Sequence, residues 1–313
     1  MNKKQNVATL LTMILVLISG LLFCRIRGEF LRADSLCSKE ARWIEMALTT
    51  PDDLPALPAG EPLLRFLQIT DTHHRREDMD LTTLDANETR LLDLIDFCNE
   101  ELKPDFVVHT GDLVHPGEGR QLRRFAAFMN RLSCPWIPVC GNHDGPDFTD
   151  CFGEVNWSFT YRGVHFVVFP VLDTFRLETF SFRTAMDWFE SDLQRQKNLP
   201  KVVFCHDPVF VWGDLGRNHR IMEKVEGVAV VLSGHLHTDL SLELGGIRHI
   251  TTWRFDRKPH RVRCCDVYAQ GIWMVSYEYE RETREFVQRG PNYFVPFSSP
   301  MKGKRSRGAG HGT

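Results

Sequence analysis

The residues of this chain that could do chemistry follow directly after short apolar runs. Five segments share the pattern: LQIT before DTHH, FVVHT before GD, IPVC before GNHD, VVFC before HDP, and VVLS before GHLH. Their carboxylate, imidazole and amide groups are the ligand types of hard to borderline divalent metals such as Mn, Fe, Zn or Ni. Because no cysteine belongs to the set, a structural zinc site is disfavoured. The pattern predicts a metal site built from several loops.

One of these segments, VVHTGDLVH (residues 107–115), resembles a complete local site. Asp112 has a histidine three residues away on each side, His109 and His115. His109 lies inside the apolar run, before the glycine, so we expect it to pack in the core as a strand residue. We expect Asp112 to work with residues from distant loops instead.

The elements that must position these residues alternate between strands and helices, and a β-rich region follows residue 245. Residues 63–70 and 104–110 predict strands, residues 84–102 have helical spacing, and residues 157–173 predict a hairpin that turns at Arg162-Gly163. Strands that are apolar on both faces, with helices between them, indicate a layered α/β domain. The hairpins favour two packed mixed β-sheets flanked by helices over one open sheet.

A layered fold would bring the polar loops to one edge, because loops after strand ends build active sites in such folds. Gly111, Gly141 and Gly234 would allow a sharp turn after each strand. In the DTH and HLH segments, the first and third side chains share one face if the backbone is extended. The residues expected to meet at this edge are Asp71, His73, Asp112, Asn142, His206, His235 and His237.

The motifs D-x-H, GD, GNHD, H and GHxH, in this order over roughly Leu63 to Thr238, resemble the calcineurin-like metallophosphoesterase family. The resemblance implies two packed β-sheets flanked by helices and a site with two divalent metal ions. It implies one ion on Asp71, His73 and His237, a second on Asn142, His206 and His235, and Asp112 as the bridge between them. A hydroxide between the ions would attack phosphorus, and His143 would protonate the leaving oxygen or stabilise the phosphate.

His115 departs from the family pattern. Members often have a second acid at this position, in GDxxD, which orients the catalytic histidine. A carboxylate would raise the pKa of His143, whereas a neutral imidazole would raise it less and a protonated one would lower it. We therefore expect a lower pH optimum than in a His115→Asp variant. Asp144 is the alternative orienting group, and we class it with His143 as a candidate catalytic residue. His74 is expected to face an anionic substrate or solvent, or to support the site.

The two ends of the chain are expected to lie outside the catalytic domain. Residues 1–24 include an uncharged apolar run and predict an uncleaved signal anchor, with the catalytic domain on the exported side of a membrane. Residues 25–62 are interpreted as a juxtamembrane segment and Pro-rich linker, residues 63–297 as the metallophosphoesterase domain, and residues 298–313 as a basic disordered tail. Flanking charges leave the orientation of the anchor open, and nine cysteines without a CxxC motif do not settle the compartment.

The overall charge and the motif set together restrict the function. A net charge of −3 gives no support to nucleic-acid binding, which phosphate neutralisation would drive. The favoured function is a membrane-anchored dimetal phosphoesterase that hydrolyses phosphodiester or phosphomonoester bonds, and a membrane-proximal phosphate ester is a candidate substrate. The alternative is a non-catalytic, metal-containing binding or scaffold protein with the same fold. All inferred ligands and His143 are present, which favours the enzyme.

Overall fold

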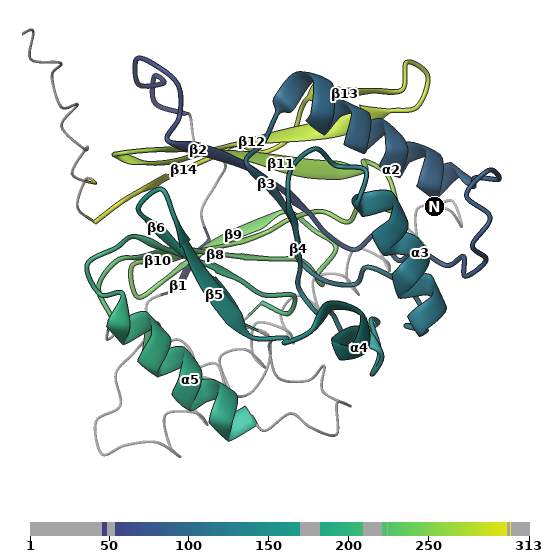
Figure 1. Cartoon of the computed structure of the whole chain (residues 1–313). Coiled ribbons are helices and arrows are strands. Elements are labelled where there is room, and N and C mark those ends of the chain that lie inside the picture. Colours follow the sequence, from purple (N-terminus) through teal and green to yellow (C-terminus); the bar gives the residue numbers. More distant parts are fainter. Residues whose placement is uncertain are drawn as a thin grey trace, which may run out of the picture.

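The computed structural model describes residues 46–48, 54–169, 182–208, 221–223, 225–298 and 301. Within them, two seven-stranded β-sheets stack face to face, and helices cover their outer sides (Figure 1). Both sheets contain parallel and antiparallel pairs. The predicted α/β fold of two packed mixed sheets flanked by helices is confirmed.

The first sheet, called the β2 sheet here, has the strand order β13-β12-β11-β2-β3-β4, and β14 also pairs with β12. Strands β2, β3 and β4 run parallel, so their carboxyl ends lie at one edge. The strands are β2 (Leu64–Ile69), β3 (Phe106–His109), β4 (Trp136–Pro138), β11 (Arg261–Tyr268), β12 (Gly271–Glu280), β13 (Glu285–Gln288) and β14 (Tyr293–Pro296).

The second sheet, called the β8 sheet, has the order β1-β9-β10-β8-β7-β6-β5. Its strands are β1 (Met46–Leu48), β5 (Trp157–Tyr161), β6 (Val164–Val168), β7 (Lys201–Phe204), β8 (Val228–Ser233), β9 (Leu240–Leu244) and β10 (Ile247–Thr251). Strands β6, β7, β8 and β10 are parallel. The predicted hairpin is present as β5 and β6, and its turn residues Arg162 and Gly163 both have positive φ, at 46° and 85°.

The helices cover the two outer faces of the sandwich. Figure 1 shows α2 (Ala86–Asp96) and α3 (Gly119–Met129) on the outer side of the β2 sheet, and α5 (Phe182–Arg195) on the outer side of the β8 sheet. A short helix, α4 (Phe148–Phe152), follows the β4 region. The helix predicted over 84–102 is α2 followed directly by a π-helix, η1 (Phe97–Leu102), which ends at Lys103 in the left-handed conformation.

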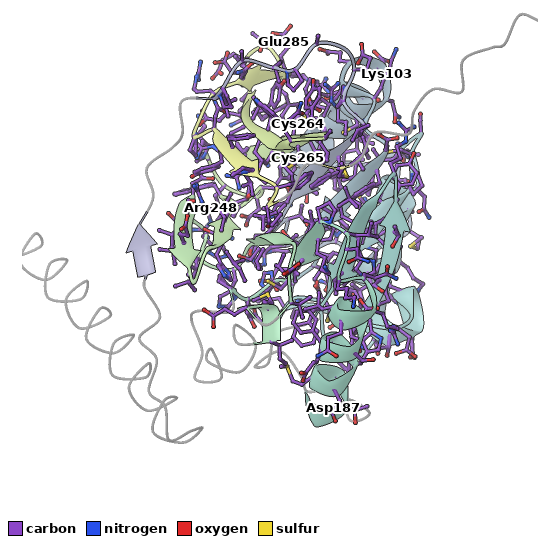
Figure 2. The ribbon with its side chains drawn as sticks, turned by 90° about the vertical axis from the view of Figure 1, so that its left-hand side faces the viewer. Lys103, Asp187, Arg248, Cys264, Cys265 and Glu285 are labelled. Atoms are coloured by element: carbon purple, nitrogen blue, oxygen red, sulfur yellow. The ribbon has the colours of Figure 1, made fainter. Side chains whose placement is uncertain are left out.

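The core between the sheets is rich in aromatic rings. The ring of Phe66 on β2 lies 5.2 to 5.8 Å, between centroids, from those of Phe106, Phe166 and Phe204. Successive residues of β11 face opposite sides: Cys264 packs in the cluster beneath α2 and α3, and Cys265 packs between the sheets (Figure 2). In the described part of the chain every cysteine is a free thiol.

The predicted membrane location is wrong. Among the residues that the structure describes, no helix has the length and apolar composition needed to cross a bilayer. The predicted anchor, residues 1–24, lies outside the described residues, as does nearly all of the predicted tail. In the segment interpreted as juxtamembrane, Met46–Leu48 forms β1 and pairs with β9.

Candidate metal centre

The polar loops after β2, β3, β4, β7 and β8 meet at one edge of the sandwich. Asp71 follows β2, Asp112 follows β3, and Asn142 follows β4, all in the β2 sheet. His206 follows β7, and His235 and His237 follow β8, in the β8 sheet. The structure therefore brings together all seven residues expected at this edge, with Asp112 in the middle.

The first group of donors surrounds Asp71. Its Oδ1 lies 3.1 Å from His237 Nε2 and 3.7 Å from His73 Nε2. The two histidine Nε2 atoms are 3.4 Å apart, and His73 Nε2 is 3.8 Å from Asp112 Oδ2. Asp71 is completely buried and His73 nearly so. Four donor atoms thus face a common point from three different loops.

The second group of donors surrounds Asn142. Its Oδ1 lies 3.1 Å from His206 Nε2 and 3.0 Å from His235 Nδ1. His206 Nε2 is also 3.2 Å from Asp112 Oδ2. His206 donates from Nδ1 to the carbonyl oxygen of Thr110 at 2.8 Å, so in the neutral ring Nε2 is the nitrogen available as a ligand. Asp112 is the carboxylate that both groups share.

The backbone at these ligands is not extended. Asp71, His73, Asp112, His235 and His237 all have positive φ, between 41° and 65°. The left-handed conformation is rarely adopted by residues other than glycine, and clusters of such residues are typical of functional sites. The DTH and HLH segments are therefore not extended, so the condition under which their first and third side chains would share one face is not met. Tight left-handed turns aim both side chains at the centre instead.

Of the three glycines that were expected to permit sharp turns, only Gly111 has a positive φ, at 91°. Gly141 and Gly234 are required for a different reason. A side chain at Gly141 would collide with the backbone of Asp112, and one at Gly234 would collide with Thr70 and Asp71. These two glycines let the loops approach each other closely.

At the centre, burial and neighbouring charges have opposite effects on the pKa values of Asp112 and His206. Burial alone would raise the pKa of Asp112, but His206 and a hydrogen bond from the backbone N–H of His143 lower it below the usual range. Burial disfavours the charged form of His206, yet Asp112 outweighs it and raises the pKa of His206. Burial lowers the pKa of His73 to about 4, and the charge of Arg254 acts in the same direction. Asp112 is therefore ionised and can accept cations.

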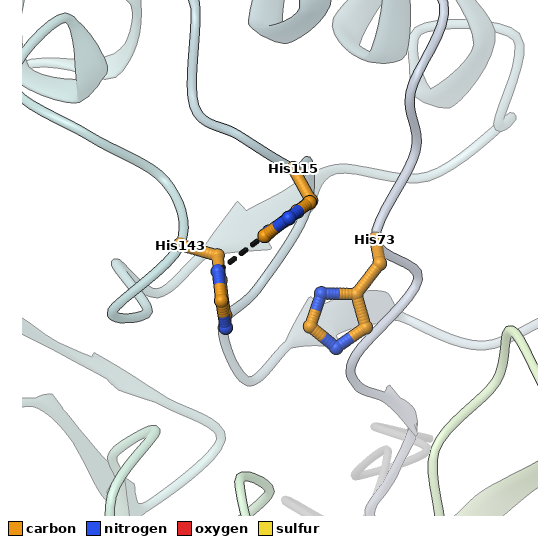
Figure 3. Close-up of side chains that lie close together, drawn as sticks. All are labelled: His73, His115 and His143. Atoms are coloured by element: carbon orange, nitrogen blue, oxygen red, sulfur yellow. Dashed lines mark hydrogen bonds between the residues drawn. The ribbon is translucent and has the colours of Figure 1, made fainter.

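His143 and His115 form a pair beside the donor groups. Their Nδ1 atoms are 2.6 Å apart, and Figure 3 shows the hydrogen bond between the two rings, with His73 next to them. His143 Nε2 lies 3.9 Å from Asp112 Oδ2. Burial lowers the pKa of His143; Asp112 opposes this effect and His115 adds to it. His115 therefore contacts the histidine that an acid would orient in the family pattern.

Asp144 and His74 lie behind the centre. The carboxylate of Asp144 is buried and accepts hydrogen bonds from the backbone N–H groups of Gly141, Asp112 and Val114. Burial and the charge of Asp112 raise its pKa to about 8. His74 is only 1% exposed, and its Nε2 lies 2.8 Å from Glu88 Oε1, so it supports the loop and does not face solvent.

His109 lies on β3, fully buried, as expected. Its Nε2 is 2.9 Å from Thr72 Oγ1, and its ring packs against Phe125.

Three further charged residues near the centre, Asp207, Arg254 and Asp256, were not predicted from the sequence. Asp207 Oδ1 lies 2.9 Å from His235 Nδ1. Arg254, which Asp256 holds, reaches His237 from the loop after β10. Asp207 adjoins a predicted ligand, but no motif marks Arg254.

The donor set fits two divalent cations. In the described residues, the donor atoms of Asp71, His73, Asp112 and His237 all lie within 4.8 Å of one another, and so do those of His206, Asp207 and His235. Carboxylate, imidazole and amide donors suit the hard to borderline metals predicted from the sequence. Buried carboxylates next to buried imidazoles also need a cation or a proton to balance their charge.

The family model described as calcineurin-like phosphoesterase matches residues 64–239, which is more than half of the chain. The chain belongs to the calcineurin-like phosphoesterase family. It is therefore a metal-dependent hydrolase acting on phosphoric ester bonds, and the family's site holds two metal ions. The resemblance inferred from the five motifs is confirmed.

The relatives of this phosphoesterase include curated proteins and solved structures. It is 24% identical over 211 residues to a 3′,5′-cyclic-nucleotide phosphodiesterase of Nostoc sp.. The matched region covers 57% of this chain and 79% of that protein. It is 23% identical over 194 residues to a probable glycerophosphodiester phosphodiesterase of Arcobacter nitrofigilis, and this match covers 55% of this chain and 71% of that protein. A dimetal phosphatase from Danio rerio has a TM-score of 0.59 at 15% identity, covering 76% of this chain and 100% of that one. At this identity the structural likeness shows the fold alone.

Proposed function

We propose that this phosphoesterase hydrolyses phosphodiesters at a centre where Asp112 joins two divalent cations. One cation would bind Asp71, His73 and His237, and the other Asn142, His206 and His235. The observation that carries the proposal is the convergence of both groups on one buried carboxylate: Asp112 Oδ2 lies 3.8 Å from His73 Nε2 and 3.2 Å from His206 Nε2. When bound, two such ions supply Lewis acidity toward the phosphoryl oxygens and a water nucleophile at neutral pH.

His143 is the proposed proton donor to the leaving oxygen. It belongs to neither donor group, its side chain is 37% exposed, and its Nε2 borders the centre. As the acid it carries protons on both nitrogens, and the Nδ1 proton is donated to His115 Nδ1 at 2.6 Å. This bond aims Nε2–H at the substrate, so His115 acts as a positioning residue. General acid catalysis of this kind is worth about 10²–10⁴ in rate.

Asp144 supports the same step without contacting the substrate. Its carboxylate bonds the backbone of Gly141 at 2.7 Å and that of Asp112 at 3.1 Å. It thereby holds the loop that carries Asn142 and His143 against the loop of Asp112. We assign Asp144 to positioning these loops.

The diester class is supported by the relatives. Both curated relatives named above are phosphodiesterases by description, one for cyclic nucleotides and one for glycerophosphodiesters. The substrate that we propose is accordingly a phosphodiester, with phosphomonoesters as poorer substrates.

The test compares two chromogenic esters. Purified protein loaded with Mn²⁺ is assayed on bis-p-nitrophenyl phosphate and on p-nitrophenyl phosphate, with chelated protein as the control. We expect metal-dependent turnover and a larger kcat/KM for the diester. A larger kcat/KM for the monoester would overturn the diester assignment. No metal-dependent turnover of either ester would leave the non-catalytic binding protein as the better description.

A further inference from the structure

Asp207 is a buried acid beside the second group of donors, and the proposed function gives it no role. It follows His206 at the end of β7, and only 1% of its side chain is exposed. The neighbouring strand β8 brings His235 next to it, because the backbone N–H of Gly234 donates to the carbonyl oxygen of His206 at 3.0 Å. The pairing of β7 with β8 therefore places Asp207 and His235 together.

The carboxylate of Asp207 lies on the side of His235 that faces the other donors. Its Oδ1 is 2.9 Å from His235 Nδ1, and the same nitrogen is 3.0 Å from Asn142 Oδ1. Asn142 Oδ1 lies in turn 3.1 Å from His206 Nε2. In the described part of the chain, donor atoms of His206, Asp207 and His235 all lie within 4.8 Å of one another. Asp207 thus contacts the donor group itself and not the back of an imidazole ring.

The distances between these donors suit one divalent ion. Two ligands that lie about 2.1 Å from an ion, at right angles to each other, are about 3 Å apart. The donor pairs Asp207–His235, Asn142–His235 and Asn142–His206 are separated by 2.9, 3.0 and 3.1 Å. His206 Nε2 and Asp112 Oδ2 continue the series at 3.2 Å. Asp207 therefore has the spacing of a ligand.

The charges of the two donor groups give a reason for a carboxylate at this position. The first group has Asp71 in addition to the shared Asp112, whereas the residues assigned to the second are one amide and two imidazoles. The affinity of a site for a divalent cation depends on the charge of its ligands. Burial of a carboxylate is costly unless a cation or hydrogen bonds compensate for it. A cation next to Asp207 would meet both requirements.

We propose that Asp207 is a ligand of the second cation, which it binds through Oδ1. The proposal rests on the dimetal centre of the proposed function and adds one ligand to it. Each cation then has one carboxylate of its own, Asp71 or Asp207, and both share Asp112. The two sites become equal in negative charge, so Asp207 increases the affinity for the second cation.

The first arm of the test measures Mn²⁺ binding to the metal-free protein by calorimetry. Groups that only hold a metal ligand in place already contribute about 10–100-fold to metal affinity. Asp207→Asn removes the charge and keeps the shape, so it should weaken one of the two Mn²⁺ binding steps by about 100-fold. The other step should be nearly unchanged, and it is the internal reference for correct folding. Two steps as strong as in the wild type, or equal weakening of both, would overturn the proposal.

The matched control removes a buried carboxylate from another histidine. Asp192 is 5% exposed, and its Oδ2 lies 2.8 Å from His165 Nε2. His165 pairs with Lys201 at the start of β7, whereas His206 follows the end of that strand, so this pair lies far from the centre. Asp192→Asn should bind Mn²⁺ like the wild type. A loss of affinity equal to that in Asp207→Asn would mean that any buried carboxylate has this effect, which would overturn the proposal.

The second arm separates a ligand from a residue that only orients His235. NMR of the bound cadmium nucleus, in protein saturated with Cd²⁺, gives one signal for each site, and its position depends on the ligands. Asp207→Asn should move one of the two signals and leave the other in place. A residue that acted only by holding His235 would leave the ligands, and therefore both signals, unchanged. Two unmoved signals would overturn the proposal.

Failure of this proposal and failure of the proposed function give different results. Both arms measure metal binding without turnover, so a protein that hydrolyses neither ester can still support the assignment of Asp207. A wild type with a single Mn²⁺ binding step would overturn the dimetal centre, and the assignment of Asp207 with it. A wild type with two steps, neither of them weakened in Asp207→Asn, would overturn the assignment of Asp207 alone.

Discussion

The ligand-bearing residues have an unusual backbone, and their surroundings maintain it. Left-handed conformations cost of the order of 1–3 kcal/mol each outside glycine. The backbone N–H of Asp71 donates to the carbonyl oxygen of Gly111, and that of His73 donates to the carbonyl oxygen of Asp112. The turns are thus fixed by hydrogen bonds between neighbouring loops, which holds the donors in place before a cation binds.

Replacing His115 with aspartate should change the pH dependence of catalysis. The proposed acid, His143, must be protonated, so activity falls as the pH rises through its pKa. Burial lowers this pKa, and His115 lowers it further. A carboxylate at position 115 stabilises the protonated ring instead. In His115→Asp, the descending limb of kcat against pH should therefore move up by about one pH unit.

A neutral replacement is the control for this effect. His115→Asn retains a hydrogen-bonding group without a carboxylate charge, and its descending limb should stay below that of His115→Asp. The same kcat–pH profile in wild type and His115→Asp would show that residue 115 does not tune His143.

All seven ligand-type residues could be predicted from the sequence, because few side chains bind divalent cations and each stood after an apolar strand. Arg254 could not. Arginines are common in the chain, and this one follows a strand end without any motif. The structure shows that it reaches the centre, because its Nη1 lies 2.9 Å from His237 Nδ1 and its loop is hydrogen-bonded to Thr70 and Asp71.

Among the elements, α2 and α3 support the centre through one buried acid. Glu88 on α2 accepts hydrogen bonds from Arg124 of α3 at 2.6 Å and from His74 at 2.8 Å. It also completes the capping box of α2 with Asp85. Because His74 follows His73 directly, this network ties both helices to the loop that carries a predicted metal ligand.

Glu88→Gln should destabilise the protein in a pH-dependent way. Burial opposes ionisation of Glu88, but Arg124 and His74 outweigh it and lower its pKa from 4.5 to about 2. The carboxylate therefore adds stability that is complete above pH 4.5 and is lost as the pH falls towards 2. At pH 7 the variant should lose about 3–5 kcal/mol, since a buried charge loses its partner.

Urea unfolding between pH 3 and 7 measures this loss, and the difference from wild type should narrow as the pH falls below 4.5. Asp96→Asn, an exposed acid on the same helix, is the control and should stay within about 0.5 kcal/mol of wild type. A difference that stays constant down to pH 3 would contradict the role of the ionised Glu88.

Long elements with a clear periodic pattern were predictable, and short ones were not. The hairpin of β5 and β6 turns where its Arg-Gly pair indicated. Strand β1 has three residues, too few for a periodic signal, and it is defined by pairing with β9. The final turns of the predicted 84–102 helix widen into a π-helix, which residue spacing alone does not indicate.

At the scale of the whole molecule, the centre joins the two sheets. Asp71, Asp112 and Asn142 come from the β2 sheet, and His206, His235 and His237 from the β8 sheet. Cations held between them should therefore stabilise the sandwich. At 100 times Kd, a bound ion adds about 2.7 kcal/mol to the free energy of unfolding.

Thermal unfolding with Mn²⁺ and with a chelator checks this coupling. Mn²⁺ should raise the Tm of the wild type, and the increase should shrink in Asp112→Asn, which lacks the shared carboxylate. An equal increase in both proteins would mean that the stabilising ions bind away from Asp112.

The central claim is that Asp112 joins two cations, and the number of Mn²⁺ ions bound per chain tests it most directly. Equilibrium dialysis followed by elemental mass spectrometry gives this number for wild type and for Asp112→Asn under the same free Mn²⁺ concentration. Two ions are expected per wild-type chain, and one or fewer in the variant. A wild type that binds only one ion, or a variant that still binds two with unchanged affinity, would contradict the account.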